Sequence, residues 1–299
     1  MNHKPDHLAA KIPQEAFDWY DEYAHGGMDR RTFMRKLSGL VALGYSMSVL
    51  TSALMPNYAL AEQVSFNDPD IVASYETFDS PAGYGTGQGY LVKPVSDASH
   101  YPAVLVIHEN RGLNPYIKDV ARRLAKAGFL AFAPDALYPV GGYPGNDDEG
   151  RALQRELDKA KLQNDFVAAA NYVKSHPLSN GKLGAVGFCF GGYMVNYLAA
   201  VDSELLAAGV PFYGTPGPKA LRNNIKAPLL IHLGELDERV NNTWPEYEQD
   251  LKENNVEYQM FMYQGAHHGF HNDSTSRFDK ASAELAWRRT LAFLKETLA

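Results

Sequence analysis

Three residues of types that cooperate in acyl transfer follow three separate apolar runs of this chain. The nucleophile candidate is Cys189, the only cysteine among 299 residues, in the run Gly187-Phe188-Cys189-Phe190-Gly191. Asp237 and His268 come later, each after another apolar run. An imidazole can take the proton of a thiol, and a carboxylate can fix the tautomer of that imidazole. The three residues therefore predict covalent catalysis through a cysteine.

The sequence around Cys189 predicts a sharp turn between a strand and a helix. An apolar run, 183–186, leads into Gly-x-Cys-x-Gly, and a helix-compatible run follows from Tyr193 to Ala200. In the Gly-x-Ser-x-Gly version of this turn, the central residue is strained and its side chain is exposed above the sheet. The flanking glycines are required because a Cβ there would collide with neighbouring elements. The alternative is a buried structural cysteine beside a Gly-rich turn.

Apolar runs alternate with helical patterns over most of the chain. Strands are expected near 75–78, 88–93, 102–108, 129–133, 183–188, 207–213, 228–233 and 256–263. The first two are expected to be antiparallel, and a Gly/Pro-rich loop is expected over 138–150, before a long helix. Continuous apolar runs are typical of strands covered on both faces. The sequence thus predicts an α/β fold, the α/β-hydrolase fold, with a mostly parallel central sheet and helices on both faces. Ligands bind beyond the carboxyl ends of such strands.

The order of nucleophile, acid and histidine along the chain is that of α/β-hydrolases. Attack of the thiol on an acyl carbon would give a thioester, which water then hydrolyses. The oxyanion is expected to bind the backbone N–H of Phe190 and a second N–H from the loop after the early buried strand, assigned to Asn110. Asp135 also follows a strand, but it precedes the nucleophile and is expected to be structural.

Five segments together resemble the dienelactone hydrolase (carboxymethylenebutenolidase) family. They are His108-Glu109-Asn110-Arg111-Gly112, Ala133-Pro134-Asp135, Gly187-Phe188-Cys189-Phe190-Gly191-Gly192, Gly234-Glu235-Leu236-Asp237 and Gly265-Ala266-His267-His268-Gly269-Phe270. The resemblance runs from about Tyr75 to the C-terminus. It implies a Cys-Asp-His triad that cleaves enol-lactones or similar activated esters without a cofactor. It also implies that Glu109 contacts the resting thiol and helps to generate the thiolate.

The chain departs from this family where the substrate carboxylate is bound. Family members that act on dienelactone use one arginine after the Pro-Asp strand and another four residues past the catalytic histidine. Here the first loop, 137–142, has no arginine, and the second position is Asn272. An uncharged amide cannot replace a bidentate guanidinium. The hydrolase chemistry is therefore expected to carry over better than the dienelactone substrate, with Arg111 and Arg277 as candidate substitutes.

Three histidines compete for the catalytic position in the last loop. The family pattern favours His268, with His267 as the alternative, while His271 is expected to form a hydrogen bond or line the pocket. The same histidines with Asp273 offer a possible metal site. Their spacing fits metal ligation poorly and there is no HExxH-like pattern, so the sequence predicts no metal and no other cofactor.

Other functions use the same residues or none of them. A thioesterase or acyl transferase would use the same triad, and a binding protein would keep only the fold. The net charge of −7 and the absence of a basic stripe argue against nucleic acid as a partner. The expected partner is a small ester or lactone.

The first 61 residues have the features of an export signal. Asp29-Arg30-Arg31-Thr32-Phe33-Met34-Arg35-Lys36 resembles a twin-arginine motif, a mildly apolar run covers 37–55, and Ala59-Leu60-Ala61 forms a small-x-small cleavage site. The prediction is a signal segment, 1–61, followed by an α/β-hydrolase domain, 62–299, that is periplasmic or secreted. An unused signal would leave it cytoplasmic. The cleaved protein is expected to have no stable membrane association, and a membrane anchor is the alternative.

Overall fold

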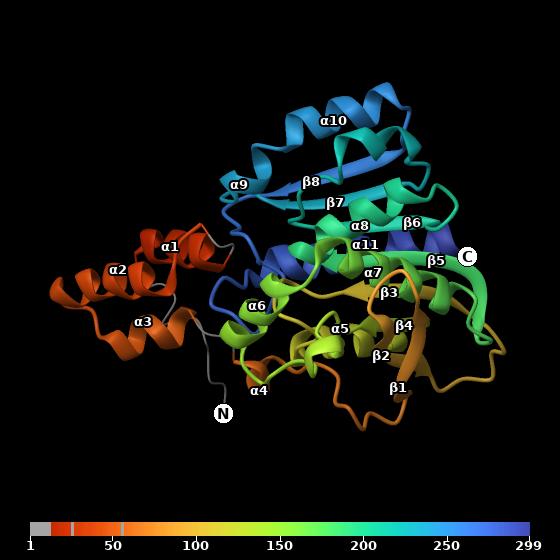
Figure 1. Ribbon diagram of the computed structural model, residues 1–299, viewed down its shortest axis with the longest axis horizontal. Coiled ribbons are helices and arrows are strands. Elements are labelled where there is room, and N and C mark those ends of the chain that lie inside the picture. The colour runs from red at the N-terminus through yellow and green to blue at the C-terminus, as the bar shows by residue number, and fades with distance from the viewer. Residues whose placement is uncertain (1–12, 25–26, 55–56) are drawn as a thin grey trace.

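The computed structural model describes residues 13–24, 27–54 and 57–299, and its centre is one eight-stranded sheet (Figure 1). The strands lie in the order β1-β2-β4-β3-β5-β6-β7-β8. They are β1 Ile71–Ser80, β2 Gly85–Pro94, β3 Tyr101–Ile107, β4 Leu130–Pro134, β5 Ser179–Phe188, β6 Ala208–Phe212, β7 Leu229–Gly234 and β8 Tyr258–Tyr263. β1 pairs antiparallel with β2, and β2 with β4, while the strands from β4 to β8 are parallel. This confirms the predicted α/β-hydrolase fold.

Helices cover both faces of the sheet, and each face has its own apolar core. In the catalytic domain they are α5 Pro115–Lys126, α6 Asp147–Glu156, α7 Lys159–Lys174, α8 Phe190–Val201, α9 Glu238–Asn241, α10 Trp244–Glu253 and α11 Lys280–Leu298. α7, α8 and α10 pack on one face, and α5 and α11 on the other. The short helices η3 Tyr138–Val140 and η4 Lys219–Asn224 lie in connecting loops. The buried strands match the continuous apolar runs because both of their faces are covered.

The predicted loop over 138–150 extends too far. A 3₁₀ turn occupies Tyr138–Val140, and α6 begins already at Asp147. Asn146 caps α6, since its side-chain oxygen accepts from the backbone N–H of Glu149. Acidic residues fill the first turn of α6, where they interact favourably with the helix dipole. The Gly/Pro content of the preceding residues hid these start signals.

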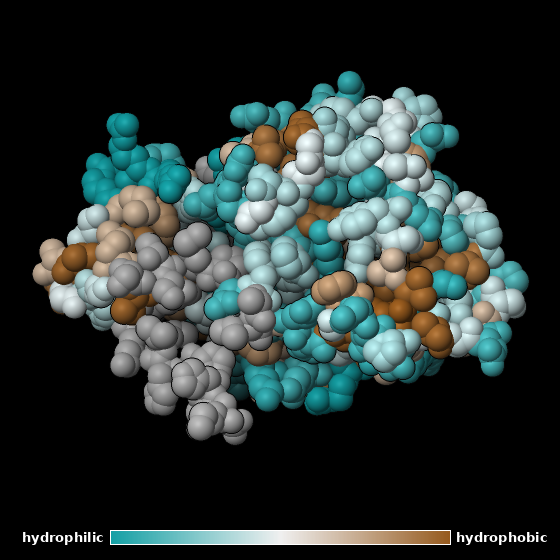
Figure 2. Space-filling model, turned by 90° about the horizontal axis from the view of Figure 1, so that it is seen from below, coloured by the Kyte–Doolittle hydropathy of each residue, from teal (hydrophilic) through white to brown (hydrophobic). Residues whose placement is uncertain are grey.

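An N-terminal group of helices lies beside the catalytic domain (Figure 1). It contains α1 Gln14–Ala24, α2 Arg30–Ala42 and α3 Met47–Leu54, and α4 Tyr58–Ala61 follows. The first three share a small apolar core that includes Phe17, Phe33, Leu37 and Leu40. Among the described residues, no helix has the length and apolar character needed to cross a bilayer. Seen from below, polar residues cover most of the visible surface, and apolar residues gather in a few places (Figure 2).

The arginine pair of the export motif begins α2. Asp29 caps this helix, because its carboxylate accepts from the backbone N–H of Thr32 at 2.9 Å. Arg30 and Arg31 are exposed on the first turn. A helix cap thus explains the acidic residue before the arginine pair. Export itself stays a prediction.

Candidate active site

Cys189 lies on a strained turn between β5 and α8. Its backbone has φ 56° and ψ −110°, a region that non-glycine residues rarely occupy and that costs about 1–3 kcal/mol. Gly187 and Gly191 allow the turn, because a Cβ on Gly187 would lie 2.1 Å from the Gly191 carbonyl oxygen and one on Gly191 would lie 2.1 Å from that of Ile107. The side chain lines a cavity of about 320 Å³ and is 8% exposed.

Asp237 and His268 meet at the same edge of the sheet. Nδ1 of His268 lies 2.5 Å from Oδ2 of Asp237, and both side chains are buried. Asp237 also caps α9, where its other oxygen accepts from the backbone N–H of Val240 at 3.3 Å. Two bonds from different directions therefore fix the carboxylate, and the carboxylate fixes the tautomer of the imidazole.

The ring of His268 packs against the ring of Tyr213, which lines the cavity. The centroids of the two rings are 5.0 Å apart, and Tyr213 lines the cavity together with Cys189. Asn110 and Phe190, the two predicted oxyanion-hole residues, line the same cavity. Phe190 is the first residue of α8, so its backbone N–H has no partner within the helix and is placed to bind an anion.

Glu109 lies under the site in a buried charge network. Its Oε2 accepts from Nδ2 of Asn272 at 3.0 Å and lies 3.4 Å from Nε of Arg111. The other end of Arg111 donates to Asp147 at 2.7 Å. Burial alone would lower the pKa of Arg111, but Glu109 and Asp147 outweigh it and raise that pKa well above its ordinary value. Arg111 therefore holds two carboxylates and does not line the cavity, so it does not replace the missing carboxylate clamp.

Comparison with known proteins decides the family. Residues 88–298 match the model of the dienelactone hydrolase family. The chain belongs to this family. A putative carboxymethylenebutenolidase of Synechocystis is 33% identical over 220 residues, which are 67% of this chain and 88% of that protein. The crystal structure of a putative dienelactone hydrolase from Klebsiella pneumoniae has a TM-score of 0.65 at 27% identity, covering 75% of this chain and 98% of its own. Membership makes this protein a carboxylic ester hydrolase.

The N-terminal segment also has a match of its own. Residues 4–42 match a second family model, described as YqhI-like. A further relative, the putative hydrolase fragment YghX of Escherichia coli K12, is 64% identical over 109 residues, which are 36% of this chain and 93% of that protein.

Tyr213 is a residue of the hydrolase site that sequence reasoning missed. It directly follows β6, and its ring is fully buried. Burial and the neighbouring Glu109 and Cys189 raise the pKa of its hydroxyl well above the ordinary value, so the hydroxyl stays protonated. The only signal in the sequence was its place at the carboxyl end of a strand, the edge where the other site residues lie.

Arginines from two helices complete the cavity wall of this hydrolase. α6 supplies Arg151, Gln154 and Arg155, and α9 supplies Arg239. Sequence reasoning did not single out these residues. Arg155 and Arg239 are exposed, while Arg151 is buried against the ring of Tyr20 at 5.5 Å.

The other two histidines of the last loop have different surroundings. His271 is buried, and its Nδ1 lies 2.7 Å from the hydroxyl of Tyr116. Burial and the charge of Arg123 lower the pKa of His271 well below its ordinary value, so the ring is neutral. His267 stacks on Phe17 of α1, with ring centroids 5.7 Å apart. Within the ranges that the structure describes, no group of three or more His, Cys, Asp or Glu side chains could hold a metal ion.

Proposed function

We propose that this hydrolase cleaves activated esters or lactones through a thioester on Cys189. One observation carries the proposal: the strained turn presents Cys189 to a cavity whose Tyr213 packs on His268, and His268 is bound to Asp237 at 2.5 Å. A thiol nucleophile, a base and an orienting acid are thereby gathered at one edge of the sheet.

The reaction has two steps. His268 takes the thiol proton, the sulfur attacks the acyl carbon, and the ester C–O bond breaks as the imidazolium returns the proton to the departing oxygen. Water, deprotonated by His268, then attacks the thioester, and the sulfur leaves as thiolate. In both steps the oxyanion is held by the backbone N–H groups of Phe190 and Asn110. In a lactone the departing oxygen stays tethered to the acyl group, and the ring opens.

Glu109 is assigned to the generation of the thiolate as an assisting base, which accepts the thiol proton when the substrate arrives and passes it to His268. It is 1% exposed, and its charge, like that of Cys189, raises the pKa of Tyr213. Asn272 and Arg111 hold one carboxylate oxygen in place. We assign Asn272, at the position where relatives that act on dienelactone have an arginine, to orienting Glu109 rather than to binding substrate.

Alkylation tests the nucleophile directly. Since Cys189 is the only cysteine, iodoacetamide has one thiol to modify, and activity should fall in step with the modified fraction measured by intact mass. The reaction at neutral pH should be faster than that of free cysteine, and a slow ester substrate should protect the thiol. Full activity in a fully modified enzyme would refute the proposal, as would a thiol that reacts only after unfolding.

The cavity favours substrates with an anionic group away from the scissile bond. Three arginines, Arg151, Arg155 and Arg239, line its wall, although none occupies the family's carboxylate-binding positions. Arginine binds carboxylates in a planar, charge-assisted geometry. We therefore infer that the acyl part of the natural substrate carries a carboxylate.

A pair of phenyl esters, one with a carboxylate and one without, tests this inference. For Arg239→Gln, the ratio of kcat/KM for the phenyl half-ester of succinic acid to kcat/KM for phenyl acetate should fall about tenfold, since a charge-assisted hydrogen bond contributes about 1.5–3 kcal/mol. Lys280→Gln is the control, because it removes one positive charge at an exposed position on α11. An equal change in both variants would show only a net-charge effect and contradict the inference.

A further inference from the structure

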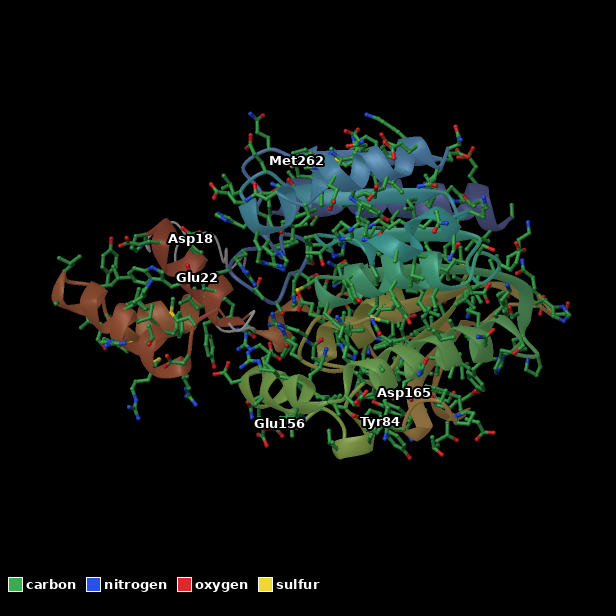
Figure 3. All side chains as sticks on the ribbon, turned by 45° about the horizontal axis from the view of Figure 1, so that its top comes forward. Asp18, Glu22, Tyr84, Glu156, Asp165 and Met262 are labelled. Atoms are coloured by element: carbon green, nitrogen blue, oxygen red, sulfur yellow. The ribbon has the colours of Figure 1, made fainter. Side chains whose placement is uncertain are left out.

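The N-terminal helices contact the loops that carry the proposed catalytic residues. Phe17 of α1 is 7% exposed and stacks on His267, the neighbour of His268 in the chain. Tyr20, one turn further along α1, lies between two arginines of the catalytic domain: its ring centroid is 5.5 Å from Arg151 and 5.2 Å from Arg277. Figure 3 shows α1, marked by Asp18 and Glu22, beside the rest of the molecule. α1 therefore packs against residues at the edge of the site.

A second set of contacts comes from residues 57–64, here called the strap. The hydroxyl of Tyr58 donates to Asp147 at 2.6 Å and accepts from Nδ2 of Asn114 at 2.9 Å. The Gln63 side chain donates to Asp273 at 2.7 Å. The strap thus connects α5, the start of α6 and the loop that follows His268.

The contact between Tyr58 and Asp147 continues to the proposed thiolate-generating carboxylate. Asp147 holds Arg111, and Arg111 lies beside Glu109. Burial alone would raise the pKa of Asp147, but Arg111 and the hydroxyls of Tyr58 and Tyr143 outweigh it and lower that pKa. The hydroxyl of Tyr58 therefore belongs to a buried charge network that runs through Asp147 and Arg111 to Glu109.

Several charged groups of the catalytic domain are buried under these contacts. Arg151 is 4% exposed and Arg277 is 6% exposed, and the ring of Tyr20 faces both of them. Removal of residues 1–61 would take away Tyr20 and Tyr58 together. It would leave two arginines without their aromatic cover and Asp147 without one of its donors, a costly change for buried charges.

We propose that the described N-terminal residues, the helices α1 to α3 and the strap, stay attached in the working enzyme and hold its active-site residues in place. Phe17 supports the loop of His268 through His267, and Tyr20 packs on the cavity residue Arg151. Tyr58 is a positioning residue that acts through Asp147 and Arg111. The inference rests on the proposed hydrolase function. It replaces cleavage after Ala61 with retention, and it leaves export through the arginine pair of α2 as a proposal.

The N-terminus of the active enzyme is the first test. The full chain is expressed in its own cells, the fractions are assayed for esterase activity, and the active species is measured by intact mass and N-terminal sequencing. Retention predicts an active species that still contains residues 14–61. An active enzyme that begins at Glu62 would overturn the inference. Alkylation of Cys189 would still test the proposed function in that shorter chain.

Support of the His268 loop is the second test, on the full chain. Phe17→Ala should lower kcat for phenyl acetate severalfold with little change in KM, because the loop that carries His268 loses a buried ring contact while the cavity lining is kept. Trp19→Ala is the matched control on the same helix, because Trp19 faces Lys36 of α2 at 5.0 Å, and its kcat should not change. An equal kcat in wild type and both variants would contradict the support, and the melting temperature separates a loss of folding from a loss of turnover.

The hydroxyl of Tyr58 gives an independent readout. Tyr58→Phe should lower kcat severalfold with little change in KM, since it disturbs the charge network and not the cavity wall. Tyr143→Phe removes the other hydroxyl on the same oxygen of Asp147, at 2.8 Å, and should act in the same direction. Tyr45→Phe removes a hydroxyl elsewhere in the helical group and should leave kcat unchanged. An unchanged kcat in Tyr58→Phe would refute the positioning role.

Discussion

Replacing Cys189 with alanine is expected to lower kcat/KM for phenyl acetate by at least about 10⁴-fold, because the covalent pathway disappears and only binding and oxyanion stabilisation remain. The fold should survive. Alanine keeps the Cβ, so the backbone strain at φ 56° is unchanged, and the lost sulfur is on a side chain at the cavity surface. The expected cost in the free energy of unfolding is about 1 kcal/mol.

The measurement pairs ester kinetics with a thermal melt of each variant. Cys189→Ser serves as a second variant, since it keeps a nucleophilic atom of similar shape on the same turn. It should retain more activity than the alanine variant and less than the wild type, and its acyl-enzyme would be an oxygen ester. Turnover by Cys189→Ala at the wild-type rate would end the covalent mechanism, whatever the melting temperature.

The second large effect is expected at Asp237. In Asp237→Asn, the amide can still cap Val240 but no longer provides a negative charge for Nδ1 of His268, so the wrong tautomer is favoured. We expect kcat to fall about 10⁴-fold with KM changed by less than about tenfold, because the effect lies in proton transfer and not in binding. Single-turnover kinetics with a phenyl ester measure the acylation step directly.

Asp135 offers the matched control for this substitution. It is the other aspartate that follows a central strand, and its carboxylate accepts from the backbone N–H groups of Leu113 and Leu137 at 3.4 and 3.0 Å. Asp135→Asn should therefore change the melting temperature more than kcat. The opposite pattern, with turnover lost at Asp135 and kept at Asp237, would reverse the assignment of the acid.

The parts of the site that the sequence predicted are those with a local signal. The turn at Cys189 has glycines at fixed offsets, and Asp237 and His268 each follow an apolar strand, so the fold brings their loops to one edge. The cap of α5 at Asn114, next to Pro115, depends on equally local residues. In each case a few neighbouring residues determine the local conformation, and the parallel sheet does the rest.

The parts that were missed depend on contacts between distant segments. Arg111 lies in the loop after β3 and Asp147 begins α6, and Tyr58 joins them from a segment that the sequence assigned to an export signal. No periodicity links these residues, and each alone has the appearance of a surface polar group. Only the folded chain shows that they are buried together, which is the usual reason that a buried ionic network escapes pattern-based reasoning.

The presence of a single cysteine has a consequence for how this enzyme withstands oxidants. Oxidation of the Cys189 sulfur gives a sulfenic acid, which many proteins protect by forming a disulfide with a second thiol of the same chain. This chain has no second thiol, so no internal disulfide can stop further oxidation to the irreversible sulfinic acid. Recovery from the sulfenic acid then depends on a small thiol reductant that can enter the same cavity as the substrate.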